Sequence, residues 1–215
     1  MTVNLNLGCS LLAMKTMKDN SYDLAVVDPP YGMIGLGAIK GGNDRKTKGR
    51  GELKGRAFHY GSYEHWDIAP NQEYFDQLLR VSKHQIIWGG QYFTDKLPAS
   101  REWITWDKCQ PWQNFSQVEL AWTSFKGTTK LYKYDNRYSG KIHPTQKPVA
   151  LYHWLFAKYT TPKMKILDTH LGSGSSAIAA HDCDLSFDGW EIDTEYHTAA
   201  VSRYNEHTRQ MKLFT

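Results

Sequence analysis

The stretch KILDTHLGSGSSAIAAHDCDLSFDGWEID, Lys165–Asp193, decides the fold expected for this chain. An apolar run ends on Asp168, a glycine-rich turn follows, and a second apolar run ends on Glu191. The residues between them are typical of a helix, so the order is strand, glycine turn, helix, strand. Strands and helices alternate elsewhere in the chain too. We therefore expect a three-layer, Rossmann-like α/β fold with a mostly parallel, mixed sheet.

The glycine turn predicts a ligand site at the carboxyl ends of these strands. Gly172 and Gly174 let a ligand approach the backbone, and Glu191 can accept hydrogen bonds from ribose hydroxyls. Open α/β sheets bind ligands at this edge, which favours a site over a turn needed only for packing. The pattern G-x-G-x-x-A also fits a dinucleotide fingerprint, so the turn alone leaves the nucleotide open.

Apolar periodicity predicts the remaining elements. Further strands are expected over residues 3–7, 24–27, 85–88, 101–107 and 118–125. Helices are expected from Ser10, as a cap, to Met17, from Pro70–Asn71 to Ser82, from Pro148 to Tyr159, and from Thr194 to near Met211. Residues 35–65 have no periodicity and predict a long loop.

The chain of 215 residues fits one domain, 1–215, with the basic loop over about 35–65 and a short basic segment over about 126–142. Lys40–Arg56 carries a net charge of +5 and Lys126–Lys141 a net charge of +4, whereas the whole chain carries +4. These two segments hold all the excess positive charge. Both a polyanionic partner and a pair of solvated loops would account for it.

The three cysteines, Cys9, Cys109 and Cys183, share no metal-ligand spacing and are odd in number. We therefore expect no metal site, no disulfide framework and a reducing compartment. The N-terminal residues lack the pattern of a signal peptide, and no apolar run approaches the length of a membrane span. The expectation is a soluble, intracellular protein without a membrane partner.

The stretch LAVVDPPYG, Leu24–Gly32, ends a predicted strand on an aspartate, two prolines and a tyrosine. The amine of an aromatic base is a poor nucleophile because its lone pair is delocalised into the ring. Two acceptors on its hydrogens, the Asp28 carboxylate and a stiffened Pro29 carbonyl, would hold the lone pair ready to attack a methyl group. Tyr31 offers an aromatic face to a base taken out of a helix. Taken alone, the motif also fits a rigid turn with a packed tyrosine.

DPPY, HPTQKP, DTHLGSGS and GWEID occur in this order, and with them the chain resembles the β class of S-adenosylmethionine-dependent DNA amino-methyltransferases. In that class the catalytic motif precedes the cofactor motif. The resemblance runs from about Gly8 to Arg203, and QIIWGGQYF and ELAWTSF look like segments of small phage and prophage members. It implies a methyltransferase fold, S-adenosylmethionine as cofactor, S-adenosylhomocysteine as product, and double-stranded DNA as partner in the cytoplasm of a bacterium or an infected bacterial host.

The resemblance also implies roles for individual residues. The catalytic group would be Asp28, Pro29, Pro30 and Tyr31. The cofactor site would comprise Asp168 at the methionine amino group, the turn Gly172, Ser173, Gly174 and Ser175, Glu191 at the ribose, Ile192 and Asp193 near the adenine, and Thr145 and Lys147 near the methionine carboxylate.

The cofactor motif departs from the family's usual D-P-F-x-G-S-G at two positions, Thr169 and His170. His170 could form the wall that the phenylalanine normally supplies, could hydrogen-bond the cofactor, or could be packed with neither role.

Larger members carry a target-recognition region where this chain has only the second basic segment, with Tyr132, Tyr134 and Tyr138 among its cations. A short or weakly preferred recognition sequence is therefore expected, and a homodimer that adds contact surface stays open. The expected DNA contacts are Lys40, Arg45, Lys46, Lys48, Arg50, Lys54 and Arg56 in the loop, and Lys130, Lys133 and Arg137 in the segment.

An aspartate rather than a serine at position 28 favours N6 of adenine, with N4 of cytosine as the alternative and N6 of adenine in RNA as the next one. A nicotinamide-dependent oxidoreductase would leave DPPY and HPTQKP unexplained. A nucleic-acid-binding protein with a degenerate fold is disfavoured because Asp28–Tyr31 and Glu191 are intact.

Overall fold

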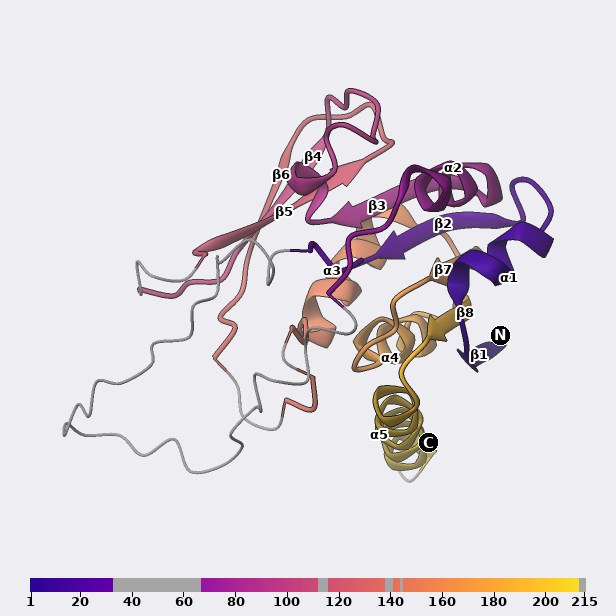
Figure 1. Ribbon diagram of the computed structural model, residues 1–215. Helices are drawn as coiled ribbons and strands as arrows, with labels where there is room; N and C mark the ends of the chain where they lie inside the picture. The colour runs from indigo at the N-terminus through magenta and orange to yellow at the C-terminus, as the bar shows by residue number, and fades with distance from the viewer. Residues whose placement is uncertain (33–66, 112–115, 138–140, 144, 213–215) are drawn as a thin grey trace, which may run out of the picture. The chain divides into compact units, whose positions relative to one another are not determined.

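The computed structural model describes residues 1–32, 67–111, 116–137, 141–143 and 145–212 (Figure 1). The expected long loop over about 35–65 lies outside this part of the chain. So do its seven expected DNA-contacting cations, Lys40, Arg45, Lys46, Lys48, Arg50, Lys54 and Arg56.

The described residues form eight strands, five helices and one short 3-10 helix. The strands are β1 (Val3–Leu7), β2 (Tyr22–Val27), β3 (Ser82–Trp88), β4 (Trp103–Asp107), β5 (Val118–Thr123), β6 (Lys130–Lys133), β7 (Lys165–Asp168) and β8 (Ser186–Glu191). The helices are α1 (Ser10–Thr16), α2 (Gln72–Val81), α3 (Val149–Tyr159), α4 (Ser175–Asp182), α5 (Thr194–Lys212) and the 3-10 helix η3 (Gly90–Tyr92).

All eight strands form one sheet in the order β1-β8-β7-β2-β3-β5-β4-β6. The five strands from β1 to β3 are parallel to their neighbours, β5 is antiparallel to both β3 and β4, and β6 is parallel to β4. The expected mixed, mostly parallel sheet is therefore confirmed.

Strand β6 was not among the predicted elements, because it lies in the basic segment. It has no continuous apolar face, and Lys130 and Lys133 at its ends are typical of an exposed edge strand. Its pairing partner, β4, lies more than 20 residues earlier in the chain, so no local pattern could reveal the ladder.

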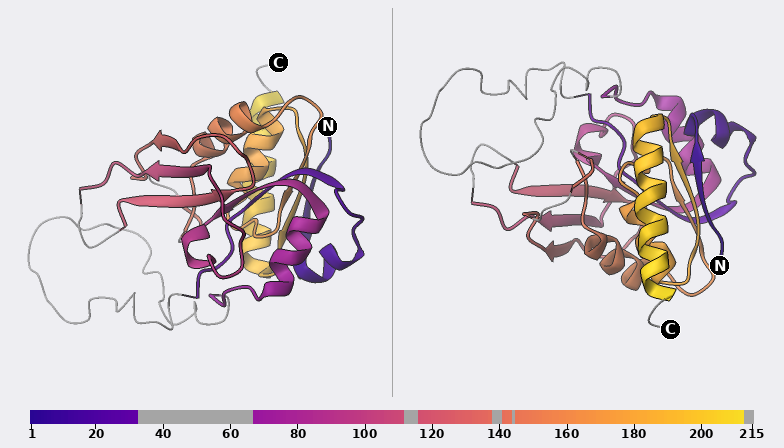
Figure 2. Two further views of the ribbon diagram at one scale, coloured as in Figure 1. Left: turned by 90° about the horizontal axis from the view of Figure 1, so that it is seen from above. Right: turned by 90° about the horizontal axis from the view of Figure 1, so that it is seen from below.

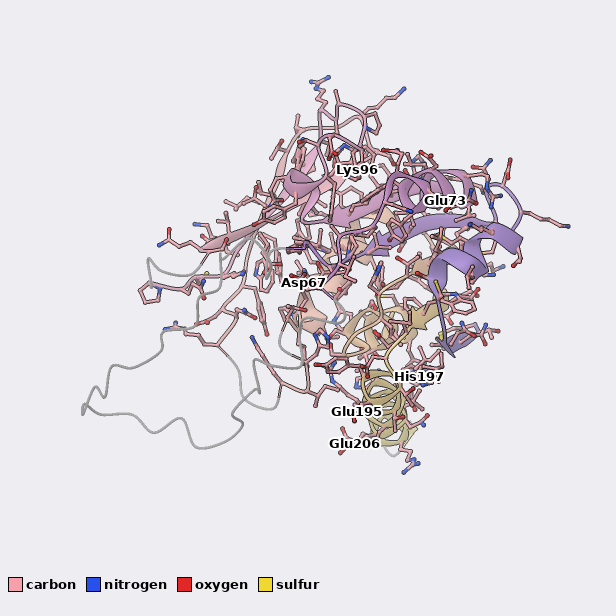
Figure 3. The ribbon with its side chains drawn as sticks, viewed as in Figure 1. Asp67, Glu73, Lys96, Glu195, His197 and Glu206 are labelled. Carbon is pink, nitrogen blue, oxygen red and sulfur yellow. The ribbon has the colours of Figure 1, made fainter. Side chains whose placement is uncertain are left out.

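Helices α1 and α2 contact each other, while α4 contacts both α3 and α5. Figure 2 shows the sheet between these two groups, which gives the expected three layers. Helix α5 also closes onto the sheet edge: His197 Nε2 lies 3.2 Å from the carbonyl oxygen of Leu5 in β1 (Figure 3). The core between the layers contains large buried side chains from both strands and helices, among them Trp88, Trp106, Phe156 and Phe187.

Local chemistry explains two helix starts. The Asn71 side chain accepts a hydrogen bond from the Tyr74 backbone N–H at 3.1 Å and caps α2, at the point where the sequence predicts a helix to open; the helix ends at Val81, one residue before the predicted Ser82. For α1 the prediction was wrong by one position: Cys9 occupies the cap, Ser10 is the first helical residue, and no side chain caps the helix.

The chain divides into two units, of which one comprises Met1–Pro29 and Asn71–Thr215 and the other Pro30–Pro70. Within it, the Gly32 backbone N–H donates to Asp67 Oδ1 at 3.0 Å. Gly32 has φ = 69°, and a Cβ there would lie 3.1 Å from the Cβ of Ala69, so only glycine fits without strain. The two ends of the unit are thus joined. Among the residues that the structure describes, no helix has the length and apolar character needed to cross a membrane.

Candidate active site

The sheet topology defines where a ligand should bind. Strands β2 and β7 are neighbours, but the chain leaves β7 toward β8 on one side and leaves β2 toward β3 on the other. The carboxyl ends of parallel strands at such a switch point are the usual ligand site of open α/β sheets. Asp28 follows β2 directly, Asp168 ends β7 and Glu191 ends β8, so the structure brings these three predicted residues to one edge.

The buried Asp168 carboxylate accepts hydrogen bonds from two uncharged donors. Oδ2 accepts from the Ser176 hydroxyl at 2.6 Å, and Oδ1 accepts from the His170 backbone N–H at 3.0 Å. Burial raises the pKa of Asp168 to about 7, and the negative charges of Asp28 and Glu191 add to the rise. A cationic partner would therefore favour the ionised form of this side chain.

Glu191 is held rigidly by backbone donors. Oε2 accepts from the Gly172 N–H at 2.8 Å, and Oε1 accepts from the N–H groups of Ile192 and Asp193 at 2.9 and 3.0 Å. Each carboxylate oxygen has two lone pairs, so Oε2, which accepts one hydrogen bond here, keeps capacity to accept another from a ribose hydroxyl. Ile192, expected near an adenine, is largely exposed.

The turn between β7 and α4 has the backbone that its glycines predict. Gly172 and Gly174 have φ = 51° and 74°, in the left-handed region. Helix α5 supports the turn, because Arg203 Nη1 donates to the Ser173 carbonyl at 2.8 Å and to Ser175 Oγ at 2.9 Å. The turn is therefore fixed in shape before any ligand binds.

His170 and Thr169 take part in a buried hydroxyl network. Tyr74 Oη lies 2.6 Å from Thr169 Oγ1, which lies 2.9 Å from His170 Nδ1. Burial lowers the pKa of His170 to about 4, so the imidazole is neutral near pH 7. The two residues that depart from the family pattern are thus in contact with each other and with Tyr74 of α2.

His143, the first residue of HPTQKP, covers the glycine turn. A Cβ at Gly172 would meet the imidazole at 3.8 Å, and the Tyr196 ring packs edge-on at a centroid distance of 4.4 Å. Burial, reinforced by the charge of Lys147, lowers the pKa of His143 to about 4. Thr145, expected near the methionine carboxylate, is exposed, and its Oγ1 lies 3.1 Å from His143 Nδ1.

Lys147 lies between two carboxylates. Its ammonium forms an ion pair with Asp28 Oδ2 and lies 3.1 Å from Glu119 Oε2. Lys108 Nζ in turn lies 2.6 Å from Glu119 Oε1. Asp28, expected to hold the target amine, is therefore linked through Lys147 to Glu119 and Lys108 in a row of alternating acidic and basic side chains.

The described part of the second basic segment presents cations beside aromatic rings. Tyr132 and Tyr134 stack nearly parallel at 6.0 Å, and Tyr132 packs on Trp154 at 5.0 Å. Lys133 is exposed, whereas Arg137 Nε donates to Asp135 Oδ1 at 2.9 Å. Lys130 Nζ donates to the Thr128 hydroxyl, and Tyr138 lies outside the described residues.

The residues at this edge fit S-adenosylmethionine. Left-handed glycines leave the backbone open to a ligand, Glu191 presents a fixed carboxylate suited to ribose hydroxyls, and Asp168 offers a buried acceptor to an ammonium group. No group of three or more His, Cys, Asp or Glu side chains within the described ranges has the arrangement to hold a metal ion. All three cysteines are free thiols.

Four residues of this edge were not predicted as site residues: Tyr74, Lys108, Glu119 and His143. Glu119 had a usable signal, since it is an acid inside an otherwise apolar predicted strand. His143 begins a motif already singled out. The sequence carries no signal for Tyr74, which lies on the apolar face of α2, or for Lys108, which is an ordinary lysine after β4.

Comparison with known proteins points to one class. Residues 113–202 match a family model described as DNA methylase. The type II methyltransferase M2.MboI of Moraxella bovis is 25% identical over 97% of this chain and 90% of its own length. The fold is shared with the M1.HpyAVI–SAM complex (TM-score 0.62, 18% identity, covering 94% of this chain and 99% of that one). It is also shared with the cytosine-N4-specific PvuII DNA methyltransferase (TM-score 0.61, 16% identity, covering 97% and 92%).

The chain thus has the α/β methyltransferase fold. Fold, site and family match together support an S-adenosylmethionine-dependent DNA amino-methyltransferase, a class that acts on N6 of adenine or N4 of cytosine.

Proposed function

We propose that this protein transfers the methyl group of S-adenosylmethionine to N6 of adenine in double-stranded DNA, in the cytoplasm of a bacterium or of an infected bacterial host. The observation that carries the proposal is the position of Asp28: it follows β2 at the switch point, beside the β7 and β8 ends that carry Asp168 and Glu191. The amine acceptor and the cofactor-binding residues thus come from adjacent strands.

S-adenosylmethionine supplies an electrophilic methyl carbon when bound. Asp28 and the Pro29 carbonyl accept the two amine hydrogens, which turns the nitrogen lone pair out of the plane of the base. As the N–C bond formed, the bond between sulfur and the methyl carbon would break and S-adenosylhomocysteine would leave. Positive charge would develop on the nitrogen, the Asp28 carboxylate would stabilise it, and the alkylated amine would then lose one proton to solvent. Tyr31 stacks on the flipped base. No strong base is required, because the amine becomes acidic only as it is alkylated.

Asp168, His170 and the turn Gly172–Ser175 would hold the methionine part and the ribose side of the cofactor, together with Glu191. Ile192 and Asp193 would lie near its adenine. Thr145 stays a proposed neighbour of the methionine carboxylate. DNA would be held by Lys130, Lys133, Arg137 and the cations of residues 40–56, with a second copy of the chain as a further source of contact surface.

N4 of cytosine is the second candidate, because PvuII DNA methyltransferase shares the fold and acts on that atom. The test uses isotopically labelled S-adenosylmethionine with unmethylated DNA and, in a parallel reaction, with RNA, followed by digestion to nucleosides and mass spectrometry. Label on N6-methyladenine is expected. Label on N4-methylcytosine would correct the base and keep the mechanism, whereas label in RNA alone would contradict a DNA substrate.

A further inference from the structure

We propose that Lys147 is a positioning residue that orients the Asp28 carboxylate for the target amine, and that Glu119 acts through Lys147 by fixing its ammonium from the other side. This inference rests on the proposed function, because Asp28 must be the amine acceptor. It differs from the role that the resemblance implies for Lys147, which is to bind the methionine carboxylate of the cofactor.

The Lys147 ammonium is enclosed by two carboxylates and an aromatic ring. Lys147 Nζ is ion-paired with Asp28 Oδ2, lies 3.1 Å from Glu119 Oε2, and lies 5.3 Å from the centre of the Trp88 ring. The Lys147 side chain is only 3% exposed. A lysine that is buried along its stem and paired at its tip has lost the mobility of a surface lysine, so its ammonium is a fixed point.

The pKa values of Lys147 and Glu119 are shifted in the directions that keep both side chains charged. Burial lowers the pKa of Lys147, but Asp28 and Glu119 outweigh that effect and hold the pKa above its ordinary value. Burial raises the pKa of Glu119, but Lys147 and Lys108 outweigh it and hold the pKa below its ordinary value. Lys147 and Glu119 are therefore both charged near pH 7, and basic and acidic side chains alternate along the row from Lys108 through Glu119 and Lys147 to Asp28.

The antiparallel direction of β5 brings Glu119 to this edge of the sheet. Because β5 runs antiparallel to β3, its first residues lie at the edge where β3 ends: Ala121 pairs with Trp88, and Glu119 comes two residues earlier. Glu119 is also the register partner of Trp106 in β4. Trp106 is followed in the chain by Asp107 and Lys108, which brings Lys108 close to Glu119. Within the part of the chain that the structure describes, Glu119 forms ion pairs with Lys108 and Lys147, so its link to Asp28 runs through Lys147.

The ion pair with Lys147 fixes the direction in which the Asp28 carboxylate points. The Asp28 backbone is fixed by the end of β2 and by Pro29, and rotation of its side chain decides where the carboxylate points. Lys147 sets that rotation. A carboxylate has about four lone-pair sites, so an ammonium on Oδ2 does not by itself use up the capacity of Asp28 to accept from an amine N–H. Loss of orientation by even a small angle lowers the rate of a step that depends on alignment.

The experiment is a double-mutant cycle with Lys147→Met, Glu119→Gln and the combined variant. For each, kcat and KM are measured for methyl transfer to DNA, and the Kd of S-adenosylmethionine is measured by calorimetry. We expect kcat to fall at least tenfold in each single variant, with the Kd of the cofactor within about threefold of wild type. The combined variant should be no slower than Lys147→Met alone. Lys83→Met is the matched control: Lys83 pairs with Asp23 at the other end of β2, at 2.7 Å.

Two results would overturn the inference while leaving the proposed function intact. An unchanged kcat with a tenfold or larger rise in the cofactor Kd would make Lys147 a cofactor ligand, and additive losses in the combined variant would mean that Glu119 acts independently. If Lys147→Met does not fold, the nearly isosteric Glu119→Gln decides, since an unchanged kcat in that variant contradicts the proposal. Failure of the proposed function gives a different signature, a wild-type protein that methylates no DNA, and the inference would fall with it.

Discussion

Asp28 and Asp168 stand at the carboxyl ends of two adjacent parallel strands from opposite halves of the chain. In the ladder between β2 and β7, Ala25 pairs with Leu167. Ala25 lies three residues before Asp28, and Leu167 lies one residue before Asp168. The charge of Asp28 contributes to the raised pKa of Asp168, so the two carboxylates interact electrostatically. The proposed amine acceptor and the proposed cofactor ligand are therefore coupled by position and by charge.

Asp28→Asn should abolish most methyl transfer and leave cofactor binding intact. The amide keeps the size of the carboxylate but loses the negative charge that stabilises the developing ammonium, and removal of such a group costs about 10²–10³-fold in kcat. Single-turnover transfer and the Kd of S-adenosylmethionine give the two readouts. Asp23→Asn, on the same strand, is the control. Transfer near the wild-type level would show that Asp28 does not hold the amine.

The affinity for S-adenosylmethionine should depend on pH below 7. Burial raises the pKa of Asp168 to about 7, so at lower pH the free protein carries a proton there. A cationic amino group favours the ionised carboxylate, so binding at pH 6 must release that proton, and the Kd rises by up to about tenfold per unit as the pH falls. Calorimetry in buffers of different ionisation enthalpy measures the proton release. Asp168→Asn should bind more weakly with no such release; equal proton release in both proteins would assign it to another group.

Gly90→Ala should destabilise the fold through crowding. A Cβ at Gly90 would lie 2.9 Å from the Trp122 backbone nitrogen and closer still to its Cβ. Backbone atoms of a central strand cannot move away easily, and overpacking of this kind costs about 1–3 kcal/mol. Urea unfolding gives the change in free energy. Gly172→Ala is the comparison, since its added methyl meets nothing closer than 3.8 Å and only the left-handed backbone is strained. A smaller loss for Gly90→Ala than for Gly172→Ala would contradict the crowding argument.

Replacing Lys130 and Lys133 by Gln should weaken DNA binding and flatten its salt dependence. Each phosphate contact contributes about 0.9 to the slope of log K against log salt, so loss of two contacts lowers the slope by up to about 1.8. Fluorescence anisotropy over a salt series measures it. Lys15→Gln is the control, because Lys15 lies on α1 and pairs with Glu73 on α2 at 2.7 Å. An unchanged slope would leave β6 as a solvated edge strand.

A matching prediction concerns the basic loop. Neutralising Lys46, Lys48, Arg50 and Lys54 together should lower the DNA affinity more than the β6 variant does, since four charges are removed rather than two. The same anisotropy series tests it. Equal affinity to wild type would show that this loop does not contact DNA.

Much of this fold follows from local sequence. The strands ending at Val27, Trp88 and Asp168 and the helix from Gln72 to Val81 have strong apolar patterns and clear turn residues, and all are confirmed. Likewise, Gly172 and Gly174 could be identified because a left-handed turn needs glycine whatever packs around it.

By itself, the sequence determined the order of strands and helices, the glycine turn, and the acids that end β2, β7 and β8, because each depends on residues close together in the chain. Tertiary structure alone decided that β5 runs antiparallel, that β6 joins β4, and that Lys147 meets Asp28 across 119 residues of sequence. Strand pairing and buried ion pairs join distant segments, and their stability comes from burial and charge balance that exist only once the chain has folded.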